Sequence, residues 1–130
     1  MKSARDETTK KLDGKELNGA IFRVVWNGNV SGLRELLETY DDVTERVINS
    51  IIGLKALHYA TMYGQVNVAK LLIHKGADIN FVDNCGLSAL CYASSRSKSV
   101  PLILELLCLG AKIDKNALEN DETGLLVQIE

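Results

Sequence analysis

The sequence has few aromatic residues, almost no net charge and no long apolar run. Aromatic residues make up 5% of its 130 residues and apolar residues 46%, which favours one domain with a core of Leu, Ile, Val and Ala. The formal net charge of −2 gives no general attraction to a polyanion. No run of 18 apolar residues is present, and the start from Met1 to Asp6 lacks the apolar stretch of a signal peptide. We therefore expect no membrane span and no secretory signal.

Cysteine is also scarce. Cys85, Cys91 and Cys108 are odd in number and lack the spacing of a metal site, which favours reduced thiols over a disulfide framework. We expect a soluble protein of the cytoplasm, with the nucleus as the alternative compartment. A nucleic-acid role would rest only on Lys10 and Lys11. Phosphate binding usually needs several clustered cations, so we expect no nucleic-acid partner.

What the sequence does contain is a repeated unit, and its best copy runs from Gly53 to Asn80. Apolar residues fall at helical spacing on both sides of Gly64. This pattern predicts two short helices, the first broken by Gly64 and the second ended by Gly76. Two such helices bury little by themselves and need neighbours of the same kind to cover their apolar faces.

Neighbours of this kind are present on both sides. Shifting the unit forward by 33 residues gives ten identities, once one extra residue is allowed at the Ser97–Lys98 turn. Shifting it backward by 36 gives a weaker match at Ala20, Gly28, Val30 and Leu36. The division that we expect is a mobile arm at 1–12, units at about 13–49, 50–82 and 83–115, and a partial fourth unit or capping tail at 116–130.

The repeated unit resembles the ankyrin repeat, which has about 33 residues, a Thr-Pro-Leu-His box, a Gly in mid-unit and a Gly-Ala-Asp ending. The box reads Lys55-Ala56-Leu57-His58 in the middle unit and Ser88-Ala89-Leu90-Cys91 in the third. The resemblance implies an all-α ankyrin-repeat solenoid of about three helix-turn-helix units, with short β-turn fingers and a partial C-terminal cap. It also implies the property common to that family, which is binding other proteins through surface residues that vary.

Local signals predict several element ends. Asp13 with Glu16 forms a capping box for the first helix. Pro101 suits the first turn of the helix that follows the serine-rich segment 94–99. The connection 41–52 has apolar residues at helical spacing, so we expect a short extra turn or an extended helix there rather than a plain loop.

The resemblance also implies where a partner would bind. In this architecture the first helix of each unit lines a concave face, and the two residues before the mid-unit turn point out of it. Stacking would align these residues in two rows, Trp26, Met62 and Ser95 in one and Asn27, Tyr63 and Arg96 in the other. Trp, Tyr and Arg are the residue types most enriched at binding hot spots, and Met adapts to irregular partners.

Fingertip residues would extend this surface, and these are Ile51, Leu54, Asn84 and Leu87. We expect Ile51 and its neighbour Ile52 to be half-buried. An alternative to the binding hypothesis is that Trp26 and Tyr63 pack on the connection 41–52 or on each other.

No residue pattern predicts a catalytic centre, a metal site or a cofactor. In the family, the histidine of the box hydrogen-bonds the backbone of neighbouring turns, and we expect this role for His58. Cys91, its counterpart in the third unit, would lie about 10 Å away, too far to share a zinc ion. His74 lies in the last turn of its predicted helix, so we expect it to face solvent.

We therefore expect a non-catalytic protein–protein interaction module that acts as an adaptor, scaffold or competitive inhibitor. The alternative is an assembly subunit that self-associates or docks to a larger chain through helix 101–109 and the C-terminal tail. That helix is apolar almost all round and needs a cover. We expect a monomer rather than a homo-oligomer.

Overall fold

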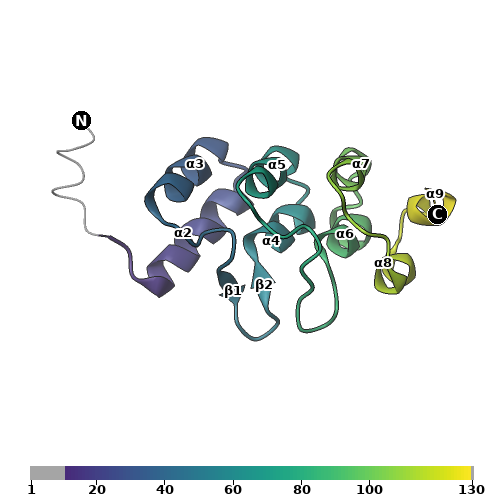
Figure 1. Ribbon diagram of the computed structural model, residues 1–130, viewed down its shortest axis with the longest axis horizontal. Coiled ribbons are helices and arrows are strands. Elements are labelled where there is room, and N and C mark those ends of the chain that lie inside the picture. Colours follow the sequence, from purple (N-terminus) through teal and green to yellow (C-terminus); the bar gives the residue numbers. More distant parts are fainter. Residues whose placement is uncertain (1–10, 130) are drawn as a thin grey trace.

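The computed structural model describes residues 11–129, so residues 1–10 of the expected N-terminal arm lie outside the described part. The described chain consists mainly of short helices that follow one another in pairs. They are α2 (Gly14–Trp26), α3 (Val30–Thr39), α4 (Ala56–Met62), α5 (Val66–His74), α6 (Ala89–Tyr92), the π-helical turn η1 (Ala93–Ser97), α7 (Val100–Cys108), α8 (Lys115–Asn120) and α9 (Leu125–Ile129). Figure 1 shows an elongated stack, with α2, α4, α6 and α8 in one row and α3, α5, α7 and α9 in a second row. The prediction of an all-α solenoid of paired helices is confirmed.

The core is continuous along this stack. Corresponding residues Ile21, Leu57 and Leu90 lie on α2, α4 and α6, and all three are buried. Helix α2 packs on α4, α4 on α6 and α6 on α8, while α3 packs on α5 and α5 on α7. Each pair therefore covers its apolar faces with those of the next pair, as a repeat architecture requires.

The predicted caps are present. The Asp13 carboxylate accepts from the Glu16 N–H at 2.8 Å, and the Glu16 carboxylate accepts from the Asp13 N–H at 3.0 Å. Pro101 lies in the first turn of α7, and the Ser99 hydroxyl accepts from the Leu102 N–H at 3.3 Å. A helix begins at each point because the free N–H groups of its first turn find these acceptors.

The connection 41–52 forms a turn and then a β-hairpin. The N–H groups of Glu45 and Arg46 donate to the Asp42 carbonyl, which closes one short turn as predicted. The alternative of an extended helix is wrong, because the next residues form β1 (Val47–Asn49), which pairs antiparallel with β2 (Leu54–Lys55). This hairpin is the first finger. The loop 79–87 is the second finger, and both project from the same side of the stack (Figure 1).

The third unit holds its extra residue as a π-helical turn. Helix α6 continues directly into η1, where the wider winding takes up one residue more than an α-helix does. Lys98 then turns the chain with a φ of 52°, whereas the middle unit uses Gly64 with a φ of 71°. The serine-rich segment thus takes the place that Gly64 has in the middle unit.

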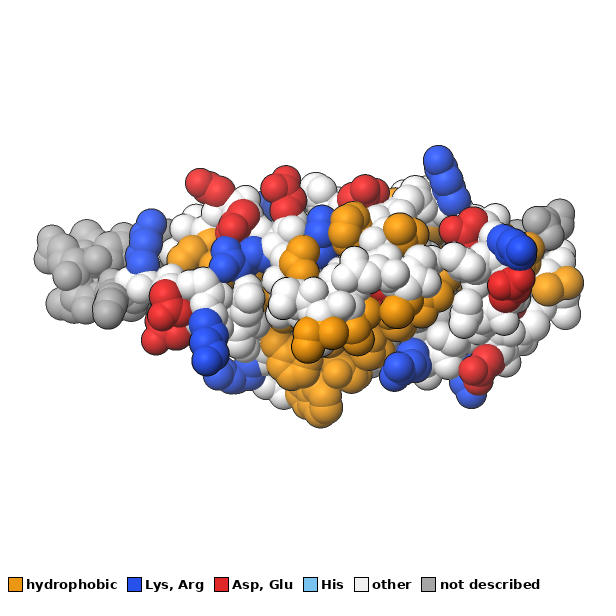
Figure 2. Space-filling model, turned by 90° about the horizontal axis from the view of Figure 1, so that it is seen from below, with side chains coloured by type: hydrophobic (Ala, Val, Ile, Leu, Met, Phe, Trp, Pro, Cys, Tyr) orange, Lys and Arg blue, Asp and Glu red, His pale blue; other side chains and the backbone are white. Residues whose placement is uncertain are grey.

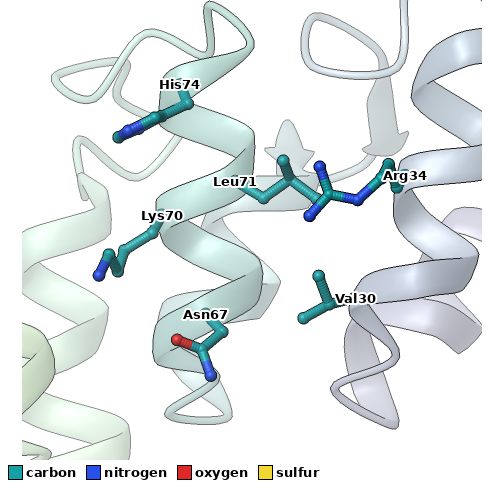
Figure 3. Close-up of a pocket in the computed structure, with 6 residues that line it drawn as sticks. All are labelled: Val30, Arg34, Asn67, Lys70, Leu71 and His74. Atoms are coloured by element: carbon teal, nitrogen blue, oxygen red, sulfur yellow. The ribbon is translucent and has the colours of Figure 1, made fainter.

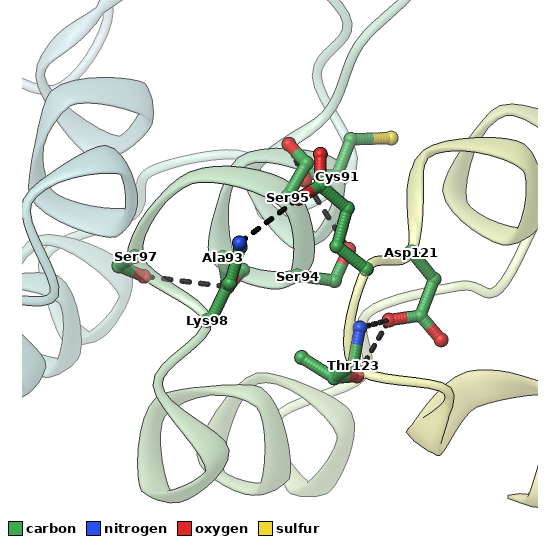
Figure 4. Close-up of polar contacts among 9 residues, drawn as sticks. Cys91, Ala93, Ser94, Ser95, Ser97, Lys98, Asp121 and Thr123 are labelled. Atoms are coloured by element: carbon green, nitrogen blue, oxygen red, sulfur yellow. Dashed lines mark hydrogen bonds and ion pairs between the residues drawn. The ribbon is translucent and has the colours of Figure 1, made fainter.

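The C-terminal tail forms a shortened fourth pair, α8 and α9. Ala117 and Leu126 from this pair are fully buried. The Glu122 N–H donates to the Ser94 carbonyl at 3.1 Å, and the Lys98 ammonium lies 2.9 Å from the Glu122 carboxylate. Figure 4 shows the tail lying against the turn of the third unit. Within residues 11–129, no helix is long and apolar enough to cross a membrane.

Candidate functional site

We call α2, α4, α6 and α8 the inner helices and α3, α5, α7 and α9 the outer helices (Figure 1). Four aromatic side chains from two consecutive inner helices meet on one face of the stack. Phe22 and Trp26 come from α2, Tyr59 comes from α4, and Tyr63 follows at its end. The rings of Trp26 and Tyr63 are 4.6 Å apart between centroids, and those of Phe22 and Tyr59 are 5.1 Å apart, both edge to face. Each such pair stabilises the fold by about 0.5–1.5 kcal/mol more than the burial of its apolar area alone. We call these four residues the aromatic cluster.

The aromatic cluster has a buried base and an exposed rim. Tyr59 is 9% exposed and Phe22 is half-buried, whereas Trp26 is 52% and Tyr63 36% exposed. Trp26 and Tyr63 do pack on each other, as the alternative hypothesis stated, yet both keep much of their surface in water. Burial, with Tyr59 nearby, raises the pKa of the Tyr63 hydroxyl, and the charge of Arg96 opposes this. The rim therefore presents neutral aromatic surface.

Two open hollows adjoin the aromatic cluster. The first, of about 470 Å³, lies between α2 and the first finger; the residues that line it are Asn18, Gly19, Phe22, Ile48, Asn49, Ser50, Ile51 and Tyr59. The second, of about 390 Å³, follows α2 and is lined by Gly19, Phe22, Arg23, Trp26 and Asn27. Since Gly19 and Phe22 line both, the hollows are neighbours. Figure 2 views the molecule from the finger side and shows hydrophobic side chains gathered near its middle.

The first finger is held against α2 by Arg46. Its guanidinium donates to the Asn18 side chain at 2.7 Å and to the Gly14 carbonyl at 3.3 Å, and it pairs with Asp42 at 2.8 Å. At the tip, Ile51 is 87% exposed. The expectation of a half-buried Ile51 is therefore wrong, because the turn between β1 and β2 carries this side chain past the edge of the stack.

The two fingers are joined by Asn84. Its N–H donates to the Ile52 carbonyl at 2.7 Å, and its side-chain amide donates to the Ile51 carbonyl at 3.2 Å. Ile52 itself is half-buried, as predicted. Asn84 is exposed, as expected. Its hydrogen bonds also hold the first fingertip against the second finger.

His58 has the structural role that the family resemblance implied. Its Nδ1 accepts from the Lys55 N–H at 3.0 Å, and its Nε2 lies 3.2 Å from the Phe81 carbonyl in the second finger. Burial lowers its pKa, although the Phe81 carbonyl acts in the opposite direction. Neutral His58 therefore links one unit to the finger of the next.

Several predicted contact residues lie deeper than expected. Leu54 is 4% exposed, so its prediction as a surface contact is wrong. The pairing of β2 with β1 directs this side chain into the core. Met62 and Leu87 are half-buried against the core, and the Ser95 hydroxyl donates to the Cys91 carbonyl at 2.7 Å. These residues contribute less free surface than the sequence suggested.

One contact crosses the two predicted rows. The Trp26 ring, from one row, packs on the Tyr63 ring, from the other row, on the neighbouring unit. Asn27 and Arg96 are exposed. Phe22, Tyr59 and Arg23 were missed, although Phe22/Trp26 and Tyr59/Tyr63 are both aromatic pairs spaced by four residues, which lie on one helix face.

A third hollow lies between the outer helices α3 and α5. It measures about 540 Å³ and is lined by Val30, Arg34, Asn67, Lys70, Leu71 and His74. Figure 3 shows Leu71 directed toward Arg34, while Lys70 points to the other side of α5. His74 is exposed, as predicted. Its lining has no Phe, Trp or Tyr and only two aliphatic residues, Val30 and Leu71, so it offers a weaker anchor than the aromatic cluster.

Metal-ligating residues do not gather in the part of the chain that the structure describes. Between residues 11 and 129, no three His, Cys, Asp or Glu side chains lie close enough together to hold a metal ion. Cys85, Cys91 and Cys108 are free thiols, of which Cys91 is buried.

Comparison with known families agrees with the stack of helix pairs. A family model described as ankyrin repeats in three copies matches residues 21–117, which is well over half of the chain. Members of this family are in general protein–protein interaction modules and are typically non-catalytic. Three copies of the unit in the sequence, the paired helices with their fingers and this match lead to one conclusion: the chain belongs to the ankyrin-repeat family.

Proposed function

We propose that this chain binds another protein, without catalysis, through the aromatic cluster and the tip of the first finger. The observation that carries the proposal is the exposed rim, where Trp26 is 52% exposed beside Tyr63 and above a buried base. In this role the chain acts stoichiometrically, as an adaptor, a scaffold or a competitive inhibitor. We place this function in the cytoplasm, where exposed thiols such as Cys85 stay reduced.

The rim has the physical properties of a binding hot spot. Trp and Tyr offer large apolar area and lose little side-chain entropy, since each has only two side-chain torsions. The contacts with Phe22 and Tyr59 already restrict both rings before a partner arrives. Ile51 adds an aliphatic side chain at the edge of the first hollow. Burying such side chains contributes on the order of 1.5–3 kcal/mol each.

The test compares two pairs of exposed apolar residues. A partner would be captured from cell extract with the intact chain, identified, purified and titrated by calorimetry. We expect Trp26→Ala/Tyr63→Ala to weaken binding by about 2–4 kcal/mol. The control Leu104→Ala/Val127→Ala changes apolar residues that are 46% and 65% exposed on other helices. Unchanged affinity of a folded Trp26→Ala/Tyr63→Ala protein would refute the proposal.

A second candidate is an assembly role through α7 and the tail. It is favoured by Leu104 and Val127, which remain exposed at the C-terminal end of the stack. We propose a monomer, because Leu102, Ile103 and Leu106 of α7 are already fully covered within the chain. Light scattering decides between a monomer and self-assembly: a dimer that dissociates on Leu104→Glu would favour assembly.

A further inference from the structure

Two arginines flank the aromatic cluster. Arg23 lines the second hollow together with Trp26. Arg96 belongs to η1, which packs on α4, and lies close enough to Tyr63 to act on its hydroxyl. Both side chains are exposed, and neither forms an ion pair within residues 11–129. Figure 2 shows Lys and Arg side chains on either side of the central hydrophobic area.

Carboxylates are scarce on the inner helices. Helix α4 carries no Asp, Glu, Lys or Arg, and neither does α6. The one carboxylate on α2 is Glu16, which is engaged in the capping box. The outer helices, by contrast, carry Glu35, Glu38 and Glu105. Around the aromatic cluster, α2, α4, α6 and η1 therefore carry more cations than free carboxylates, although Glu119 lies on α8 at the far end of the row and the whole chain has a net charge of −2.

Gly19 provides a second, independent observation. It lies in the middle of α2, where Gly is less favourable than Ala, and it is exposed. A Cβ atom added there would meet nothing within 4 Å, so packing within the chain does not require Gly. Gly19 nevertheless lines both hollows. A residue without a side chain at this point allows the backbone of a ligand to approach the helix closely.

We propose that the partner presents an extended segment with an apolar anchor flanked by acidic residues. The anchor packs on Trp26 and Tyr63, the backbone crosses Gly19, and the flanking carboxylates face Arg23 and Arg96. This inference rests on the proposed function and adds the chemistry of the partner. Aromatic rings can also bind a cationic side chain of a partner, but the two arginines would repel such a side chain.

The test is an unbiased selection of peptides from a displayed random library against the intact chain. We expect enriched peptides to carry an apolar residue with Asp or Glu on both sides. For a synthetic copy of such a peptide, Arg23→Glu/Arg96→Glu should weaken binding roughly tenfold at physiological salt. The control Arg34→Glu/Lys70→Glu makes the same change in net charge on the outer helices α3 and α5 and should change affinity less than twofold.

The outcomes separate this inference from the proposed function. Peptides that depend on Trp26 and Tyr63 but lack acidic residues, or that carry Lys or Arg, would overturn the inference and leave the proposed function standing. Peptides that bind equally to Trp26→Ala/Tyr63→Ala would count against both. If no peptide is enriched, the inference falls, and the titration with the captured partner still decides the proposed function.

Gly19→Ala tests the path of the peptide backbone. We expect this variant to raise the melting temperature, because Ala favours the helix and no neighbour obstructs it. The same change should weaken the acidic peptide about fivefold or more, since the new methyl group occupies the line of approach. A stabilised variant with unchanged peptide affinity would overturn the path across Gly19.

Discussion

At the scale of single residues, His58 links neighbouring units through both nitrogens of its buried ring. Its Nδ1 accepts from the Lys55 N–H, so the proton of the neutral ring lies on Nε2, which donates to the Phe81 carbonyl. The centroids of the Phe81 and Tyr92 rings each lie 5.7 Å from that of the imidazole. Burial lowers the pKa of His58, which means that the folded chain holds the ring in its neutral form.

Stability should therefore fall at acidic pH. Because the pKa of His58 is lower in the folded chain than in the unfolded one, the unfolded chain binds the proton more tightly. The stabilisation is fully present above the unfolded pKa of about 6.5, begins to be lost as pH falls below it, and goes on being lost down to the lower pKa of the folded chain. We expect the free energy of unfolding, measured with urea, to decrease between pH 7.5 and pH 5.5.

His58→Gln should remove this part of the pH dependence and cost about 1–3 kcal/mol at pH 7.5. His74→Gln, which changes an exposed histidine, should retain the pH dependence of the natural chain. A pH profile that is the same with and without His58 would show that the imidazole is not held neutral by the fold.

At the scale of elements, the third unit makes its mid-unit turn with a serine-rich segment that ends at Lys98, where the middle unit uses Gly64. The hydroxyls of Ser94, Ser95 and Ser97 donate to carbonyls of the preceding turn (Figure 4). Such side-chain bonds to carbonyls three or four residues earlier are a common way for serine to sit within a helical turn. The chain then turns at Lys98 in the left-handed region, where a side chain is unfavourable.

Two substitutions separate the backbone strain at Lys98 from its ion pair. Lys98→Gly and Lys98→Ala both remove the exposed pair with Glu122, so that loss is common to them. Only Gly relieves the positive φ of 52°. We expect the Gly variant to be more stable than the Ala variant by about 1 kcal/mol in urea denaturation. Equal stability would mean that the turn is rebuilt when the lysine is replaced.

At the scale of the whole molecule, each helix pair packs mainly on the pairs next to it in the row. The pair α8 and α9 at the C-terminal end is the shortest. Leu126 is fully buried in α9, and Ile21 is fully buried in α2 at the other end. In such a row, stability is close to a sum of unit and interface terms, so damage at one end stays local.

Leu126→Ala should loosen the C-terminal end alone. Removing a buried leucine costs about 2–5 kcal/mol, since it leaves a cavity. We expect hydrogen exchange to speed up in α8, α9 and η1 while α2 to α5 keep their protection. Ile21→Ala should give the reverse distribution. Uniform loss of protection in both variants would mean that the stack unfolds as a single cooperative unit.

The regular part of this fold could be predicted from the sequence, because helix periodicity, glycine stops and caps are local signals. The repeat of Leu57 at Leu90 and the capping box at Asp13 follow from spacing and residue type, and the role of His58 was implied by the resemblance to the ankyrin repeat. The first finger could not be predicted in the same way. Its strands depend on pairing between β1 and β2, and that pairing exposes Ile51 and buries Leu54.

The candidate site could likewise be predicted only in part from the sequence. The sequence by itself determined that units stack and that Trp26 and Tyr63 lie near the mid-unit turns of neighbouring inner helices. Only the tertiary structure decided that Phe22 and Tyr59 complete the aromatic cluster and that Arg23 and Arg96 flank it. The physical reason is that a helix repeat fixes which residues share a face, whereas the reach of each side chain across the gap between units depends on the packing of both helices.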